Sequence, residues 1–188
     1  MHEYVTKAVV LDKTTRSGEA DARYSFFTER YGKIAARATS SRKIVSKLAG
    51  HLEPGTVSAV RIIEQRGTRV VDALKITRLP IAIADLASLN NLLGEWEPDA
   101  ALWNEFRRTA VQAKKASGIA SVAFWRNTLA ILGWDPQGAV CANCERLAFG
   151  PGGGKGMYFY IPRQEYFCAE CAAAGRASRF APNDLILV

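Results

Sequence analysis

Four cysteines carry the clearest chemical pattern in this 188-residue chain. They form two C-x-x-C pairs, residues 145–167 separate the pairs, and no cysteine occurs elsewhere: Cys141, Cys144, Cys168 and Cys171. Zinc favours a tetrahedron of thiolates, and the tight turn of a C-x-x-C pair directs two sulfurs at one ion. Because four thiolates leave no open position for water or substrate, we predict a structural zinc site with four cysteine ligands.

Two alternatives for these cysteines are a pair of disulfides and a set of unrelated buried thiols. The cysteines within one C-x-x-C pair are poorly placed to bridge each other, and disulfides belong mainly to oxidising compartments. The chain starts Met1-His2-Glu3-Tyr4, which lacks the pattern of a secretion signal, and it contains no run of about 18 apolar residues. We therefore expect a cytoplasmic protein that does not span a membrane.

Side chains suited to catalysis are scarce. His2 and His51 are the only histidines, and neither accompanies a recognisable nucleophile or carboxylate cluster. The glycine-rich segment 150–156 does not match a phosphate-binding loop, because Phe149 takes the place of the first glycine and Gly156 follows Lys155. We expect neither enzymatic activity nor a small-molecule substrate.

The chain is basic, with 25 Lys and Arg against 18 Asp and Glu and a formal net charge of +7. Such an excess favours a polyanionic partner, above all nucleic acid. Residues 30–52 contain six basic residues and no acidic one. From this block we predict five DNA contacts, which would grip phosphates with little sequence preference: Lys33, Arg37, Arg42, Lys43 and Lys47. The other interpretation of the block is a solvated surface.

Several aromatic residues adjoin this block, namely Tyr24, Phe26, Phe27 and Tyr31. One hypothesis is that their rings stack on unpaired bases. For Phe26 and Phe27 a place in the hydrophobic core is the stronger interpretation.

The first 80 residues have the pattern of a small β-barrel. Short runs rich in β-branched and aromatic residues alternate with turn residues, which predicts five strands: 4–11, 23–28, 33–38, 57–64 and 69–77. This number of strands fits an OB-fold, whose face commonly binds oligonucleotides, and it also fits an SH3-like barrel.

From Ile81 the apolar residues follow a helical period, and we expect helices over 83–93, from Pro98-Asp99 to about 113, and over 121–132. The sequence thus predicts an α+β protein of three parts. These are a five-stranded barrel over 1–80, a short helical domain over 81–138, and a four-cysteine zinc module with a C-terminal tail over 139–188.

Several segments, in this order and spacing, resemble the RecO family of bacterial DNA repair and recombination mediators. They are the opening strand 4–11, the turn Gly18-Glu19-Ala20-Asp21, the segments 27–34 and 42–54, and the junction 132–136 that leads into the first cysteine pair. Phe167 before the second pair continues the likeness. One departure is Glu145, which stands where the family often has glycine after the first pair.

The resemblance implies an N-terminal OB-fold that binds single- and double-stranded DNA, a helical domain and a zinc module. It also implies a nucleoid-associated protein that anneals complementary strands, contacts the single-strand-binding protein SSB, and works with RecR to load RecA. The alternative is an adapter that holds an acidic partner tail through its helical region, where Arg107 and Arg108 lie off the apolar stripe, with little DNA activity of its own.

Overall fold

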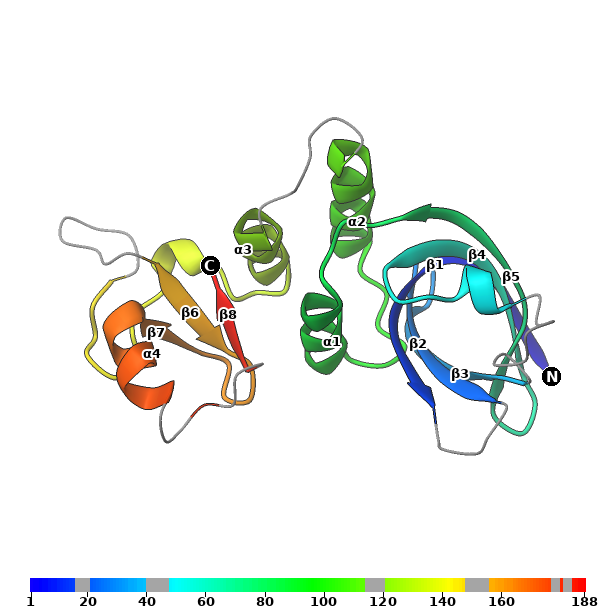
Figure 1. Cartoon of the computed structure of the whole chain (residues 1–188), viewed down its shortest axis with the longest axis horizontal. Coiled ribbons are helices and arrows are strands. Elements are labelled where there is room, and N and C mark those ends of the chain that lie inside the picture. Colours follow the sequence, from blue (N-terminus) through cyan, green and yellow to red (C-terminus); the bar gives the residue numbers. More distant parts are fainter. Residues whose placement is uncertain (16–20, 40–47, 114–120, 148–155, 177–179, 181–183) are drawn as a thin grey trace. The chain divides into compact units, whose positions relative to one another are not determined.

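The computed structural model describes residues 1–15, 21–39, 48–113, 121–147, 156–176, 180 and 184–188. The chain divides into two compact units, Met1–Gly118 and Ile119–Val188. The first contains a five-stranded barrel with two helices, and the second contains a small sheet with two helices and the four cysteines (Figure 1). The α+β class predicted from the sequence is confirmed.

Five strands form the closed barrel of the first unit, in the order β1-β2-β3-β5-β4. They are β1 (His2–Thr15), β2 (Ala22–Thr28), β3 (Gly32–Ala38), β4 (Thr56–Glu64) and β5 (Thr68–Arg78), with a short 3-10 helix, η1 (Ala49–His51), before β4. The long strand β1 pairs with β2 on one side and with β4 on the other. The barrel closes where β3 meets β5 in parallel, through Arg37 opposite Arg69. All five predicted strands are present, and β1 is longer than predicted at both ends.

Alternate residues of the strands fill the interior of the barrel. Ile34, Ala36 and Ala38 of β3 point inward, together with Tyr24 and Phe26 of β2. Phe27 points outward but is equally buried, because it packs against Phe106 of the helix Ala100–Ala113 with ring centroids 5.8 Å apart. Phe26 and Phe27 are therefore core residues as interpreted, and the burial of Tyr24 removes its ring from base stacking as well.

Helices α1 (Ile83–Leu92) and α2 (Ala100–Ala113) pack against the barrel. The Asn90 side chain of α1 accepts a hydrogen bond from Ser25 of β2, and the indole Nε1 of Trp103 in α2 donates to Glu29 at 3.0 Å. Helix α2 begins at Ala100, just after the predicted start at Pro98-Asp99, and Asp99 caps it by accepting from the backbone N–H of Leu102. These two helices belong to the first unit and α3 to the second, which divides the expected helical domain of 81–138 between the units.

The segment that follows α1 covers the part of β3 that β5 does not reach. The backbone N–H of Trp96 donates to the carbonyl of Lys33 at 2.9 Å, and Glu95 forms a parallel bridge with Lys33. Gly32 makes this close approach possible, since a Cβ built there would lie 2.3 Å from the backbone of Glu97.

The second unit is built around a three-stranded antiparallel sheet in the order β7-β6-β8. Trp134, Phe159 and Tyr166 pack in sequence along its inner face, and the Tyr166 hydroxyl donates to the Trp134 carbonyl at 2.6 Å. The elements are α3 (Ser121–Ile131), η2 (Pro136–Gly138), β6 (Met157–Tyr160), β7 (Glu165–Cys168), α4 (Ala169–Arg176) and β8 (Leu185–Leu187). In the described part of the chain, no helix has both the length and the apolar character needed to cross a bilayer.

Candidate metal centre and nucleic-acid interface

The four cysteines come together in the second unit, as their spacing predicts. Their Sγ atoms all lie within 4.8 Å of one another, and all four are free thiols, so the disulfide alternative is wrong. The Sγ atoms of Cys144 and Cys168 are 3.7 Å apart. A zinc ion with Zn–S bonds of about 2.3 Å needs sulfurs separated by about 3.8 Å, so the cluster is compatible with a tetrahedral zinc site.

Two different local structures present the thiols. Cys141 and Cys144 lie on a tight turn, in which the N–H of Glu145 donates to the Cys141 carbonyl at 2.9 Å. Cys168 ends β7 and Cys171 lies in the first turn of α4. Glu145 has a φ of 58°, in the left-handed region that favours glycine, which is the residue that the RecO-like pattern has at this place.

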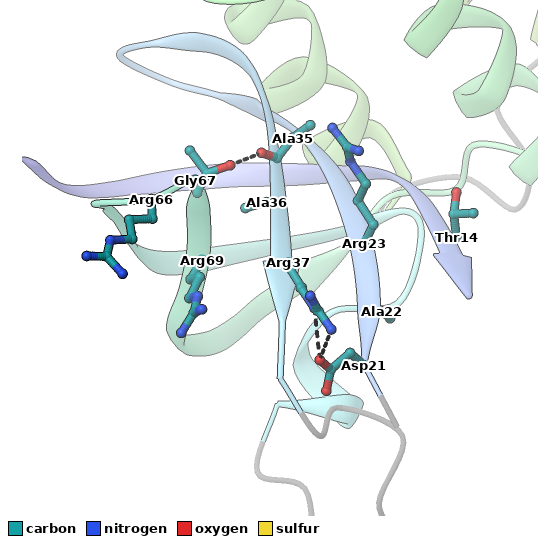
Figure 2. A pocket seen from close by; sticks show the side chains of 11 residues that line it. Thr14, Asp21, Ala22, Arg23, Ala35, Ala36, Arg37, Arg66, Gly67 and Arg69 are labelled. Carbon is teal, nitrogen blue, oxygen red and sulfur yellow. Dashed lines mark hydrogen bonds and ion pairs between the residues drawn. The ribbon is translucent and has the colours of Figure 1, made fainter. Parts of the chain in front are cut away.

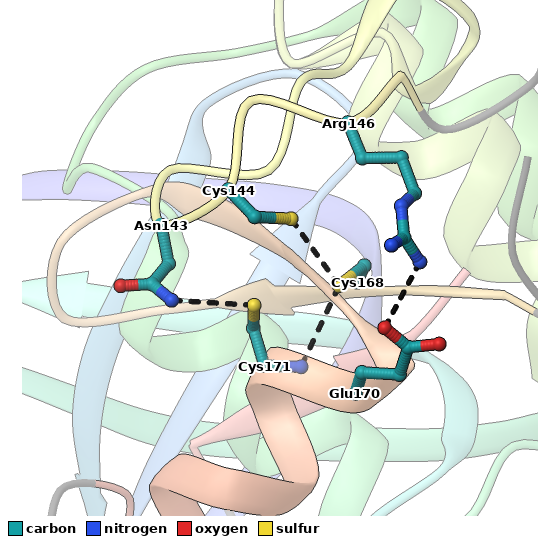
Figure 3. Close-up of polar contacts among 6 residues, drawn as sticks. All are labelled: Asn143, Cys144, Arg146, Cys168, Glu170 and Cys171. Carbon is teal, nitrogen blue, oxygen red and sulfur yellow. Dashed lines mark hydrogen bonds and ion pairs between the residues drawn. The ribbon is translucent and has the colours of Figure 1, made fainter.

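Polar contacts connect the first cysteine turn to the second pair (Figure 3). The Asn143 side-chain amide donates to the Sγ of Cys171 at 3.3 Å, and Arg146 forms an ion pair with Glu170 of α4 at 3.0 Å. Groups that donate hydrogen bonds to metal-bound thiolates orient them and stabilise their charge. Asn143 is thus a supporting residue of the cluster, and the Arg146–Glu170 ion pair ties the turn to α4. Cysteine spacing alone reveals neither contact.

The thiols differ in acidity. Burial raises the pKa of Cys141, but hydrogen bonds with the backbone of Cys168, Asn143 and Cys144 outweigh it and lower that pKa to about 6. The Asn143 amide lowers the pKa of Cys171, but hydrogen bonds with the other thiols and burial together raise it to about 12. A divalent cation that binds all four sulfurs must therefore displace protons from the cluster.

The structure describes two of the five predicted DNA contacts, and it separates them. Lys33 and Arg37 share the outer face of β3, as their spacing predicts. The Lys33 ammonium donates to the carbonyl of Asn90 in α1 at 2.9 Å, which gives it a structural role at the helix end. Arg37 lies at the other end of β3, 59% exposed, and forms an ion pair with Asp21 at 2.6 Å. Arg42, Lys43 and Lys47 lie outside the described residues.

Arg37 lines a hollow of about 580 Å³ in the surface of the barrel. Strands β2 and β3 and the turn between β4 and β5 line it, and they supply four guanidinium groups, from Arg23, Arg37, Arg66 and Arg69 (Figure 2). Thr68 holds the turn in place by donating to the Ala35 carbonyl of β3. Among the described residues, Arg37 is the one member of this arginine set in an ion pair, so the hollow carries a net positive charge.

Three arginines of the hollow, Arg23, Arg66 and Arg69, are not among the DNA contacts predicted from the sequence. The acid-free block covers only residues 30–52, so Arg23 precedes it and the other two follow it. The contribution of the β4–β5 turn depends on the pairing of β5 with β3, which no local pattern records. A signal for them in the sequence is the segment Gln65-Arg66-Gly67, a basic turn between the last two predicted strands of the barrel.

Comparison with known proteins now identifies the family. Residues 1–79 match the family described as Recombination protein O N terminal. A DNA repair protein RecO of Bifidobacterium adolescentis is 30% identical over 185 residues, which cover 88% of this chain and 72% of that protein. The chain belongs to the RecO family.

Further relatives are consistent with this assignment. A DNA repair protein RecO of Myxococcus xanthus is 28% identical over 99% of this chain and 80% of its own length. Another, of Dehalococcoides mccartyi, is 29% identical over 77% of this chain and 62% of its own length. The RecO-family domain at the N-terminus is OB-fold-like, and the arginine-lined hollow lies on strands β2 and β3 and the β4–β5 turn, where OB-folds bind oligonucleotides.

The basic residues of α2 are less available than their sequence suggests. Arg108 donates through Nε and Nη2 to the carboxylate of Glu105, at 2.8 and 2.7 Å. The hydrogen bonds with this carboxylate raise the pKa of Arg108. In this RecO-family chain, the arginine pair expected to capture an acidic tail is thus reduced to Arg107.

Proposed function

We propose that this RecO-family protein acts in DNA repair and recombination by binding single- and double-stranded DNA at the arginine-lined hollow. The observation that carries the proposal is that Arg23, Arg37, Arg66 and Arg69 all line one hollow in the surface of the barrel. Guanidinium groups match phosphate geometry well, and contacts with phosphates give affinity without reading sequence.

The proposed activity is annealing. Complementary single strands repel each other through their phosphates, and a basic surface that neutralises several phosphates lowers that repulsion. The binding free energy then comes largely from the release of counterions. By its resemblance to the family, the protein would work with RecR and SSB to help load RecA on SSB-coated DNA.

No catalytic step is part of the proposal. His51, one of the two histidines, accepts a hydrogen bond through Nδ1 from the backbone N–H of Lys75 at 3.1 Å, which gives it a place in the barrel structure. The cysteine cluster would hold zinc as a structural ion, with Cys141, Cys144, Cys168 and Cys171 as its ligands. Its part is to tie the first cysteine turn to β7 and α4.

The test is salt-dependent DNA binding and annealing with labelled complementary oligonucleotides. If four arginines engage phosphates of a single strand, log K should fall with log salt at a slope of about −2.8. In the double variant Arg66→Ala/Arg69→Ala the slope should become shallower, at about −1.4, and annealing should slow. The matched control is Lys7→Ala/Lys75→Ala, which removes two exposed cations that lie on β1 and β5 outside the hollow. Equal slopes in the two double variants would refute the proposed site.

A further inference from the structure

The sheet of the second unit has aromatic side chains on both of its faces. Met157 and Phe159 of β6 and Tyr166 of β7 form the inner, buried face. The intervening residues, Tyr158 and Tyr160, point to the other side and remain partly exposed. An outward face usually carries polar residues, so an outer face of aromatic rings needs a specific cause.

The strand register brings these outward rings together. Tyr158 of β6 lies opposite Phe167 of β7 on one side and Leu187 of β8 on the other. Tyr160 and Phe167 approach with ring centroids 6.3 Å apart and an interplanar angle of 74°. The outer face therefore presents neighbouring rings from adjacent strands.

Phe180 adds a third ring from a separate segment. Its centroid lies 4.8 Å from that of Tyr160, edge to face, and 5.1 Å from that of Phe167. The ring rests on Gly175 of α4, where a Cβ would lie 2.3 Å from it. The absence of a side chain at Gly175 lets Phe180 reach the face of the sheet.

These three rings line a hollow of about 360 Å³ that also contains polar groups. Arg163 lines it, 69% exposed, with its guanidinium 3.3 Å from the carboxylate of Glu165. Asn143, on the first cysteine turn, lines it as well. Ring faces next to hydrogen-bonding groups are suited to a flat heterocycle with polar edges, whereas an aliphatic partner would use neither the rings nor the polar groups.

The second unit, which carries this face, has a much smaller excess of positive charge than the chain as a whole. Residues 119–188 contain six Lys and Arg and five Asp and Glu, so the second unit contributes little to the net charge of +7. A ligand held here depends on stacking more than on attraction to phosphates. Every nucleobase has a π-face, so such contacts tolerate any sequence, and they are available only when the bases are unpaired.

We propose that the outer face of the β7-β6-β8 sheet is a base-stacking platform for single-stranded nucleic acid, formed by Tyr160, Phe167 and Phe180. The arginine-lined hollow grips phosphates and accepts paired or unpaired strands. The platform selects unpaired bases and so gives the chain a second, chemically different contact with single strands.

The experiment uses the full chain and an oligothymidine in which one base is 5-iodouracil. Irradiation attaches the iodinated base to an aromatic side chain that it touches, and mass spectrometry locates the attachment. We expect attachment to peptides that contain β6 or β7. Attachment confined to peptides of residues 1–118 overturns the proposal.

Substitutions at Tyr160 provide the quantitative test. Tyr160→Leu removes the ring and should weaken binding of the single strand about tenfold, while Tyr160→Phe keeps the ring and should preserve it. Because stacking is not ionic, the slope of log K against log salt should stay unchanged in Tyr160→Leu. Thermal unfolding and metal content of both variants serve as the control that the unit remains folded.

The outcomes for the two sites are distinguishable. A salt slope reduced to about −1.4 in Arg66→Ala/Arg69→Ala, with attachment to β6 and β7 retained, supports both sites. An unchanged slope in that variant, with the same attachment, contradicts the barrel site alone. Equal single-strand affinity for Tyr160→Leu and Tyr160→Phe overturns the platform and leaves the face to a protein partner.

Discussion

Arg37 and Arg69 lie opposite each other in the parallel pairing that closes the barrel between β3 and β5. A purely structural closure would favour apolar or oppositely charged neighbours, because like charges placed side by side repel each other. Asp21 compensates one of the two guanidinium groups through its ion pair with Arg37. The seam of the barrel therefore places two guanidinium groups at the arginine-lined hollow.

The first prediction concerns Asp21, whose carboxylate would compete with DNA phosphates for Arg37 at the proposed site. Asp21→Asn removes this negative charge from the edge of the hollow, so DNA should bind more tightly, by about two- to fivefold at low salt, with a steeper dependence on salt. Fluorescence anisotropy titrations over a range of salt concentrations measure both effects. Asp72→Asn, at an exposed position of β5 outside the hollow, is the control and should leave binding unchanged. Weaker binding by Asp21→Asn would show that Asp21 serves to position Arg37.

The second prediction concerns removal of metal from the cysteine cluster. Metal-bound thiolates lose their ligand role when protonated, so the stability that a metal gives is present at neutral pH and is lost as the pH falls towards about 5. The pKa of Cys171, raised to about 12, means that protons compete strongly there. Hydrogen exchange after chelation or at low pH should show β6 and β7 deprotected while β1–β5 remain protected. Equal loss of protection in both units would contradict a local role for the metal.

The strands and the cysteine cluster were predictable because each follows from a local pattern. Alternation of apolar residues marks β2 and β3, and two C-x-x-C turns can be recognised without knowledge of the fold. The split of the helical region was not predictable in this way. The assignment of α1 and α2 to the first unit depends on contacts such as Phe27 with Phe106, which join segments far apart in the sequence.

The candidate DNA contacts show the same limit. The charge pattern identified Lys33 and Arg37 together. It does not show that the Lys33 ammonium donates a hydrogen bond to the carbonyl of Asn90. Charge counting along the sequence detects only a continuous basic block. The residues of the arginine-lined hollow come from β2, β3 and the β4–β5 turn. A surface assembled by strand order is not apparent until that order is known.

The third prediction concerns the backbone of the first cysteine turn. Glu145 has a φ of 58°, which costs a residue with a side chain more than it costs glycine. Glu145→Gly should therefore stabilise the second unit by about 0.5–1 kcal/mol, after allowance for the greater freedom of glycine in the unfolded chain. Glu145→Ala is the matched control, because it removes the same carboxylate without relieving the backbone. Chemical denaturation followed by the fluorescence of the second unit's tryptophans compares the three proteins, and equal stability of the Gly and Ala variants would exclude a backbone cause.

The fourth prediction concerns Gly32, at the start of β3. Its φ is 71°, and a Cβ there would lie 2.3 Å from the backbone of Glu97, so Gly32→Ala combines an unfavourable conformation with a clash that no side-chain rotation relieves. We expect a loss of about 3 kcal/mol in the free energy of unfolding of the first unit. Gly67→Ala separates the two causes, because Gly67 also has a positive φ, of 114°, but has open space around it. Gly50→Ala, with open space and no positive φ, should be neutral. If the three variants unfold at the same denaturant concentration, the segment after α1 moves aside at little cost. Its contact with β3 then contributes little to the stability of the barrel.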